Sequence, residues 1–407
     1  MSTSLLYHAF GAFEHTHIKT EYEGGEIYFH AKKRERPWKC PACQTRRDFV
    51  IHSWQTRQLK NLPIGGRATY LVLHLRIFEC RQCGERFQES RQVARPRKSY
   101  TKRFEKYVWS LSQTMTLSDI ARHVGVGWDL VKDIVKRRLQ RVVSKRKWKH
   151  LTHIAIDEIA IGRGHQYLTV VLDLETGRAV YVEEGKDHEA LEGFFRKIKR
   201  AGATLEAIAV DMSTAYRKAI RKYAPQGVDV VHDKYHLVAS MNDAIDSIRR
   251  QEQRRLEGED KRVLKGTRYL LLYGQEKLDE KSPDKLARLE DVLEANELLQ
   301  KAYLLKEQFR RFWDQPNKRA AKLFLSNWIL EALSVGNRHL TKMAKRVFRH
   351  LDRILAWYDH EISTGPLEGM NNKIKTLQRQ AFGFRDDEFF KLQILTLHEK
   401  ERRLIGA

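Results

Sequence analysis

The 407-residue sequence is poor in cysteine, in acidic residues and in long apolar runs, and each shortage excludes a class of protein. Its four cysteines are too few for the disulfide framework of a secreted scaffold, so a reducing, cytoplasmic setting is expected. No apolar stretch is long enough to cross a bilayer, so no membrane partner is expected. The apolar segment 5–10 is short, is interrupted by His8 and follows no basic region, which argues against a signal peptide.

The shortage of acidic residues leaves a net charge of +24, from 76 Lys and Arg against 52 Asp and Glu. The excess is concentrated in residues 1–150, which hold 31 basic and 13 acidic residues, a net +18. Such a surface suits a polyanion. An anionic membrane is the weaker candidate, because the sequence has no basic amphipathic segment beside a lipid anchor. Nucleic acid is therefore the expected partner, and the length predicts about two or three domains.

All four cysteines fall in two Cys-x-x-Cys pairs, Cys40 with Cys43 and Cys80 with Cys83. Each pair lets two thiolates approach one ion, and two pairs complete a tetrahedral Zn²⁺ site. The 36 residues between the pairs exceed the usual zinc-ribbon spacing, and the strand-like segment 70–78 predicts a β-hairpin or two within them. Four free thiols or two redox pairs are the alternatives, and both are disfavoured because no cysteine lies outside the pattern.

A basic linker, residues 91–103, leads into three predicted helices at 104–111, 117–124 and 128–143, with a tight turn at 125–127. The third helix places apolar side chains at intervals of three and four, at Trp128, Val131, Val135, Leu139 and Val142. Its other side carries the candidate DNA contacts Lys132, Lys136, Arg137 and Gln140. Helix, glycine turn and basic helix indicate a helix-turn-helix that enters a major groove, with a purely structural three-helix bundle as the alternative.

From Leu151 onward the pattern changes to strands alternating with helices. Strands are expected at 152–161, 166–174, 178–183, 207–211 and 228–231, with a helix capped by Asp187 and another at 214–223. This βββαβαβα order is that of an RNase H-like fold, in which the first and fourth strands are adjacent. The fold class is thus α/β, with an all-α insertion expected at 237–350 before the closing helix.

Three acidic residues are expected to come close together in this fold. Asp157 lies inside an apolar strand, Asp211 ends another, and Glu368 comes near the start of the closing helix. A buried carboxylate costs solvation free energy unless an ion or a distant group pairs with it. Three such acids can hold two divalent ions side by side, the arrangement used for phosphodiester chemistry. Glu158, next to Asp157, is expected on the opposite face of the strand.

Other polar residues near these acids have two interpretations each. Asn371, Asn372 and Lys375 follow Glu368 on the same helical face and are expected to meet DNA. His236 is either a hydrogen-bond donor behind the metal site or a helix-capping histidine. Tyr216, close to Asp211, suggests a tyrosine recombinase, but packing within a helix is favoured.

A second basic stripe lies within the expected insertion, opposite an apolar side. It consists of Arg338, Lys342, Lys345, Arg346, Arg349 and Arg353. Such a stripe is either a solvated face or a DNA contact.

The chain resembles the DDE transposases of bacterial insertion sequences, specifically the ISL-three type, over nearly its whole length. The resemblance is carried by the second cysteine pair with residues 84–87, the helix-turn-helix, and the strings at 156–158, 210–212, 233–236 and 368–375, with Arg379 and Gly383. Thr364 departs from it, because many members have Asn there.

This resemblance implies that Asp157, Asp211 and Glu368 are catalytic acids that use Mg²⁺ or Mn²⁺, and it adds Arg379 to the expected DNA contacts. It also implies an enzyme that recognises the terminal inverted repeats of its own element, hydrolyses DNA to a 3′-hydroxyl and joins that end to target DNA. Pairing two ends predicts a homodimer on DNA.

The expected organisation is a zinc-binding module at 1–95, a helix-turn-helix at 96–150, a first part of the catalytic core at 151–236, the insertion at 237–350, and the closing helix and tail at 351–407. Two other functions remain open. A zinc and helix-turn-helix regulator would bind DNA without cutting, and a simple RNase H-like hydrolase would cut without joining.

Overall fold

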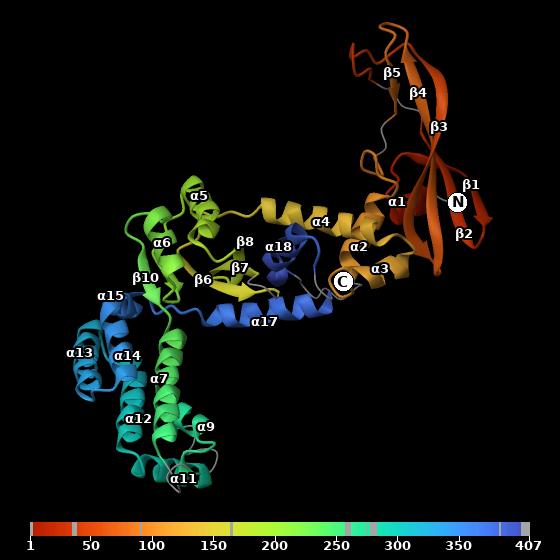
Figure 1. Cartoon of the computed structure of the whole chain (residues 1–407). Coiled ribbons are helices and arrows are strands. Elements are labelled where there is room, and N and C mark those ends of the chain that lie inside the picture. The colour runs from red at the N-terminus through yellow and green to blue at the C-terminus, as the bar shows by residue number, and fades with distance from the viewer. Residues whose placement is uncertain are drawn as a thin grey trace. The chain divides into compact units, whose positions relative to one another are not determined.

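A computed structural model describes residues 3–34, 39–89, 92–162, 166–256, 262–274, 276, 283–381 and 384–399. Arg91, the expected turn at 163–165 and Gly383 lie outside the described residues. The chain divides into two compact units, which meet in the sequence between Lys145 and Arg146 (Figure 1). Within the described ranges, no helix has both the length and the apolar character needed to span a membrane.

The first unit opens with a β-sheet that carries the cysteines at one end. Its elements are α1 (Thr3–Phe10), β1 (His15–Glu23), β2 (Glu26–Lys33), β3 (Phe49–Ile64), β4 (Arg67–Cys80) and β5 (Arg86–Gln88). The strand order is β1-β2-β4-β3, with β5 paired to β4. Gly65 and Gly66, both at positive φ, turn β3 into β4. The hairpin predicted between the cysteine pairs is therefore confirmed, whereas β1 and β2 were not foreseen.

Three helices complete the first unit: α2 (Lys102–Leu111), α3 (Leu117–Val124) and α4 (Trp128–Ser144). Thr101 and Thr116 cap the first two through their side chains, and Gly125 ends α3 in the left-handed conformation. The core-facing residues of α4 are Val131, Ile134, Val135 and Leu139. Trp128, expected on that inner face, is instead 44% exposed because it occupies the first turn, beyond the packed part of the helix.

The second unit is built on a five-stranded sheet of order β10-β9-β6-β7-β8. The strands are β6 (His153–Ala160), β7 (Tyr167–Asp173), β8 (Arg178–Glu184), β9 (Ala207–Val210) and β10 (Asp229–His232). β6, β7 and β8 pair antiparallel, while β9 runs parallel to both β6 and β10. This is the RNase H-like arrangement that the sequence predicts, with the first and fourth strands adjacent.

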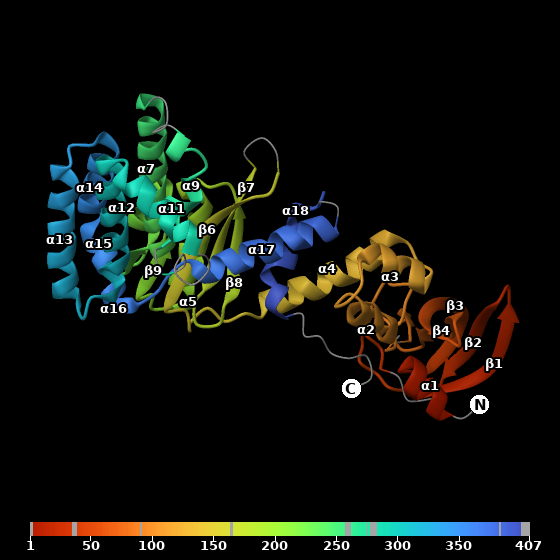
Figure 2. The same ribbon diagram turned by 90° about the horizontal axis from the view of Figure 1, so that it is seen from below.

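Helices cover both faces of this sheet (Figure 2). On one face, α5 (Glu192–Ala201) and α6 (Thr214–Tyr223) pack on Ile154, Ile156 and their neighbours. On the other, α17 (Gly365–Gln380) and α18 (Asp387–Leu395) pack on Ala155 and Ile159. Successive side chains of a strand point to opposite faces, which explains this division. The expected cap by Asp187 is not formed, because a 3₁₀ turn, η1 (His188–Leu191), precedes α5.

The all-α insertion is confirmed, although its bounds differ from those expected. It comprises α7 (Lys234–Arg255), α9 (Arg268–Leu272), α11 (Pro283–Glu294), α12 (Glu297–Arg310), η2 (Arg311–Asp314), α13 (Lys318–Ser334), α14 (Arg338–Arg349), α15 (Leu351–Leu355) and α16 (Trp357–His360). Helices thus continue to His360. The basic stripe expected on one helix is interrupted at His350, so Arg353 belongs to α15 rather than α14.

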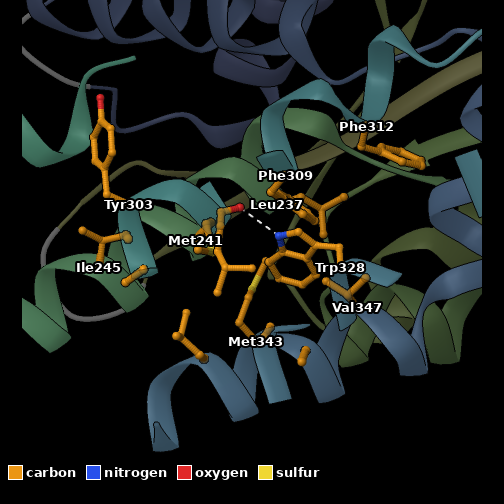
Figure 3. Packing of buried hydrophobic residues seen from close by; sticks show 14 of the residues in the cluster. Leu237, Met241, Ile245, Tyr303, Phe309, Phe312, Trp328, Met343 and Val347 are labelled. Atoms are coloured by element: carbon orange, nitrogen blue, oxygen red, sulfur yellow. Dashed lines mark hydrogen bonds between the residues drawn. The ribbon is translucent and has the colours of Figure 1, made fainter. Parts of the chain in front are cut away.

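Trp328 fills the centre of the insertion (Figure 3). Its ring packs against Phe309, and its Nε1 donates a hydrogen bond to the Leu305 carbonyl at 2.8 Å. Met343 and Val347 of α14 belong to the same cluster. Leu237 and Met241 of α7 also belong to this cluster, so the helix that directly follows β10 packs against the rest of the insertion.

Candidate active site and zinc centre

Asp157 lies within β6, and Asp211 directly follows the neighbouring strand β9. In the parallel pair of β6 and β9, Ile156 is opposite Val210, and each acid is the next residue of its chain. Both continue the alternation that places Ala155 and Ala209 on the α17 face of the sheet. The register therefore brings Asp157 and Asp211 to neighbouring positions on the same face of the sheet.

Both oxygens of Asp157 are held by hydrogen bonds. Oδ1 accepts from the Glu158 backbone N–H at 2.8 Å, and Oδ2 accepts from Asn371 Nδ2 at 3.0 Å. Burial raises the pKa of Asp157 above its usual value, although these hydrogen bonds and the nearby charge of His236 oppose that rise. Asp211 is held in turn by the Ser213 backbone N–H, at 2.8 Å from its Oδ1. The site is thus a pre-positioned pair of carboxylates.

Glu158 faces away from this pair, as expected. Its carboxylate hydrogen-bonds with Tyr216 of α6, on the opposite face of the sheet, and burial raises the pKa of Glu158. Tyr216 is fully buried, and its hydroxyl lies 3.5 Å from Thr169 Oγ1. The interpretation of Tyr216 as a packing residue is confirmed.

Glu368 lies in the first turn of α17 and is exposed. In the described part of the chain, the four cysteines are the only group of three or more metal-ligating side chains close enough to hold one ion, so the Glu368 carboxylate does not gather with those of Asp157 and Asp211. The contact that α17 makes with the strand acids comes instead from Asn371, three residues further on. Asn372, Lys375 and Arg379 are exposed along the same helix.

Asp233, to which the sequence assigned no role, ties three elements together. Its N–H donates to the Val210 carbonyl at the end of β9. Its Oδ2 accepts from the His236 backbone N–H at 3.1 Å, which caps α7, and its Oδ1 accepts from the Thr364 N–H at 2.9 Å, just before α17. Asp233 is 1% exposed. Two signals could have revealed it: an aspartate immediately after a short apolar strand, and its place in the family-like string at 233–236.

The hydrogen bonds of Asp233 also decide the expectations for His236 and Thr364. His236 is not a capping residue, because its backbone N–H is the group that Asp233 caps. Thr364 contributes its backbone N–H to Asp233, so the change from Asn at this position leaves that contact intact.

The four cysteines converge from two loops at the end of the β3–β4 hairpin. Cys40 Sγ lies 3.6 Å from Cys83 Sγ, and Cys43 Sγ lies 3.7 Å from Cys80 Sγ. Burial opposes ionisation of Cys40, yet hydrogen bonds from the backbone of Cys43 and Ala42 and from Cys83 lower its pKa to about 7. Four sulfurs within 4.8 Å of one another, with backbone amides stabilising a thiolate, fit a tetrahedral zinc site.

The candidate contacts on α4 differ in their surroundings. Lys132 Nζ lies 5.3 Å from the centre of the Trp128 ring, and Gln140 is exposed. Lys136 is half-buried. The guanidinium of Arg137 is bound to the Tyr100 hydroxyl, so part of its donor capacity is used within the module.

An RNase H-like core with one acid in its central strand and another directly after the neighbouring strand, together with a four-cysteine cluster and a helix-turn-helix, defines a DNA-processing enzyme of the DDE class. The model of the ISL3-type DDE family, described as a transposase, matches residues 154–394. Models described as the zinc-finger of transposase IS204/IS1001/IS1096/IS1165 and the helix-turn-helix domain of transposase family ISL3 match residues 36–83 and 92–139. The chain belongs to the ISL3 family of insertion-sequence transposases.

Curated relatives agree with this assignment. The transposase for insertion sequence element IS1001 of Bordetella parapertussis is 31% identical over 379 residues, which cover 92% of each chain. The transposase for insertion sequence element IS1557 of Mycobacterium tuberculosis is 30% identical over 331 residues, covering 75% of this chain and 73% of that one. The Drosophila P element transposase strand transfer complex covers 75% of this chain and 93% of its own at 12% identity, with a TM-score of 0.40, a weak likeness.

Proposed function

We propose that this transposase binds the terminal inverted repeats of its insertion sequence, hydrolyses DNA to a 3′-hydroxyl and transfers that end into target DNA. The catalytic acids are Asp157, Asp211 and Glu368. The observation that carries the proposal is the adjacent pair of carboxylates on one face of the sheet, one of them bonded to the helix that bears Glu368. Oxygen ligands of this kind suit Mg²⁺ or Mn²⁺.

Each acid has a distinct role in this proposal. Asp157 with Glu368 would hold one ion, and Asp157 with Asp211 would hold the other. Such ions would supply activation of a water or a DNA 3′-hydroxyl and stabilisation of the departing 3′ oxygen. The protein contributes position: the Ser213 amide holds Asp211, and Asn371 holds Asp157. No covalent enzyme intermediate is required.

The first unit supplies DNA recognition. We assign Zn²⁺ to Cys40, Cys43, Cys80 and Cys83, where it fixes the end of the β3–β4 hairpin. Metal analysis of the purified protein is expected to find one zinc per chain, lost on substitution of Cys83 by Ser. Lys132, Lys136 and Gln140 of α4 are proposed to contact the element ends, and Asn372, Lys375 and Arg379 to contact DNA beside the acids. Two chains acting as a dimer, in the cytoplasm, would pair the two ends.

The test combines purified protein, Mg²⁺, a labelled duplex carrying the element's ends and a target plasmid. Glu368→Gln is compared with the wild type and with Glu361→Gln, a matched change of an exposed carboxylate just before α17. The wild type and Glu361→Gln are expected to nick at the element boundary and join the 3′ end to the plasmid. Glu368→Gln is expected to bind the duplex and do neither.

Two outcomes would contradict the proposal. If all three proteins bind equally and none cuts, the chain is a DNA-binding regulator. If the wild type cuts without joining, a simple hydrolase is the better description.

A further inference from the structure

In the side-chain amide of Asn371, the nitrogen has a hydrogen-bond partner and the oxygen has none in the described part of the chain. Its Nδ2 donates to Asp157 Oδ2 at 3.0 Å. Its Oδ1 is buried and has no hydrogen-bond partner in the described part of the chain. A buried polar atom without a partner is unfavourable, and native structures rarely leave one without a reason.

The backbone holds this amide in place. Asn371 follows Glu368 by three residues, so the two side chains lie on one face of α17. The neighbouring positions Leu367, Met370 and Ile374 are buried against the sheet, which fixes the rotation of the helix. Asn371 therefore bonds Asp157 of β6 and shares a helix face with Glu368 of α17.

The unsatisfied atom of this amide is an acceptor, so it does not pair with the phosphate oxygens of DNA, which are acceptors as well. The amide nitrogen has two N–H groups, and one of them donates to Asp157. The remaining atom is a carbonyl oxygen, which pairs with a cation or with a hydrogen-bond donor. Divalent magnesium and manganese take such oxygen ligands.

We infer that Asn371 is a positioning residue of the catalytic metal site: its N–H orients the Asp157 carboxylate, and its carbonyl oxygen faces the divalent ion held by Asp157, or a water on that ion. This inference rests on the proposed function. It replaces the expected DNA contact for Asn371 and leaves that role to Asn372, which is exposed.

The experiment measures Mn²⁺ binding to the full-length, zinc-loaded protein by electron paramagnetic resonance, without DNA. Asn371→Ala is compared with Asn372→Ala, a matched change one residue away, and with Asp157→Asn as the reference for an abolished site. Loss of a group that orients a metal ligand typically weakens metal affinity 10–100-fold, so a loss of about that size is expected for Asn371→Ala. Asn372→Ala is expected to bind Mn²⁺ as the wild type does.

A second variant guards against a folding defect. Asn371→Asp has the same shape and keeps an oxygen in this position but loses the N–H that bonds Asp157, so it is expected to recover part of the Mn²⁺ affinity that Asn371→Ala loses. Element-end binding by each variant, measured in parallel, is expected to stay unchanged for Asn371→Ala, whereas a DNA contact would weaken it.

The inference fails if Asn371→Ala binds Mn²⁺ like the wild type while Asp157→Asn does not. If Asp157→Asn also binds like the wild type, the metal site of the proposed function fails, and the inference with it. The two failures are therefore distinguishable.

Discussion

Two buried histidines join the catalytic core to the insertion. His232 Nε2, at the end of β10, lies 3.2 Å from His350 Nδ1, directly after α14. Burial, followed by the charge of His350, lowers the pKa of His232 to about 3. Burial, followed by the charge of Arg217 and of Arg353, Arg349 and Arg346, lowers the pKa of His350 to about 4. Both rings are therefore neutral in the folded protein near pH 7.

This pair predicts that the second unit loses stability in mild acid. The unfolded chain takes up protons on these histidines below about pH 6.5 and the folded chain does not, so the stability falls as the pH drops from about 6.5 towards 4. For His350 the loss between pH 7.5 and pH 5 is at most about 2 kcal/mol. Chemical denaturation at both pH values measures it. His350→Asn is expected to reduce this difference, and the same change at the half-buried His188 is expected to leave it unaltered.

Asp233 bonds the starts of two helices, α7 and α17. Asp233→Ala removes the α7 cap and the bond to Thr364, so we expect a loss of about 1–2 kcal/mol of stability. Because both α7 and α17 begin at this contact, nicking is expected to fall further than element-end binding. Asn317→Ala removes a comparable cap from α13, away from the acids, and serves as the control. Equal nicking by the two variants in assays of the folded proteins would rule out a positioning role for Asp233.

The sequence predicted the roles of some of these residues and not of others. Asp157 and Asp211 were predictable because an acid in an apolar strand needs a compensating partner. Asn371 was assigned to DNA, because helical spacing shows which face a residue shares but not which neighbour it meets. The role of Asp233 depends on a bond to Thr364, 131 residues away, which no local pattern encodes.

Among the elements, α14 has the clearest division of its two sides. Its buried positions are Leu340, Met343, Ala344 and Val347, whereas Arg338, Lys342, Lys345 and Arg349 are exposed. The helix contains no acidic residue. Arg338 also lines an open cleft of about 420 Å³ with Arg250 and Arg254 of α7. This combination favours a phosphate-binding surface over a solvated face.

Replacing Lys342 and Lys345 by Ala is therefore expected to weaken DNA binding and to reduce its dependence on salt. The slope of log affinity against log salt concentration should decrease by up to about 1.8, because each phosphate that a lysine neutralises contributes about 0.9 to it. Arg196 and Lys301 are exposed but paired with Glu192 and Glu297, so their double Ala variant is the control. An unchanged slope for the α14 variant would show that this stripe is only solvated.

The modules expected to bind DNA and the strand acids belong to separate compact units. The zinc cluster and the helix-turn-helix lie in the unit that ends at Lys145, and the acids lie in the unit that begins at Arg146. Most of the excess positive charge lies in residues 1–150. The division predicts that the two activities can be lost independently.

Substituting Lys132 and Gln140 together by Ala is expected to reduce the preference for element ends over unrelated duplex by about tenfold or more, since each base contact contributes about 1–3 kcal/mol of discrimination. Mn²⁺ binding should stay unchanged in this variant. Asp157→Asn should show the reverse pattern. Binding titrations with both duplexes, in parallel with the Mn²⁺ measurement, compare the two variants. Loss of both properties in either variant would contradict the separation.

The sequence by itself determined the order of the sheet elements in the second unit and the positions of the strand acids and the cysteine pairs, and its motifs carried the resemblance that indicated the class of protein. Each of these depends on local periodicity or spacing, which short stretches of chain carry. Only the tertiary structure decided that β1 and β2 extend the zinc module, that Asp233 joins α7 to α17, and that Asn371 turns towards Asp157. Such contacts bring together residues far apart in the chain, and they form because packing and buried hydrogen bonds are satisfied for the fold as a whole.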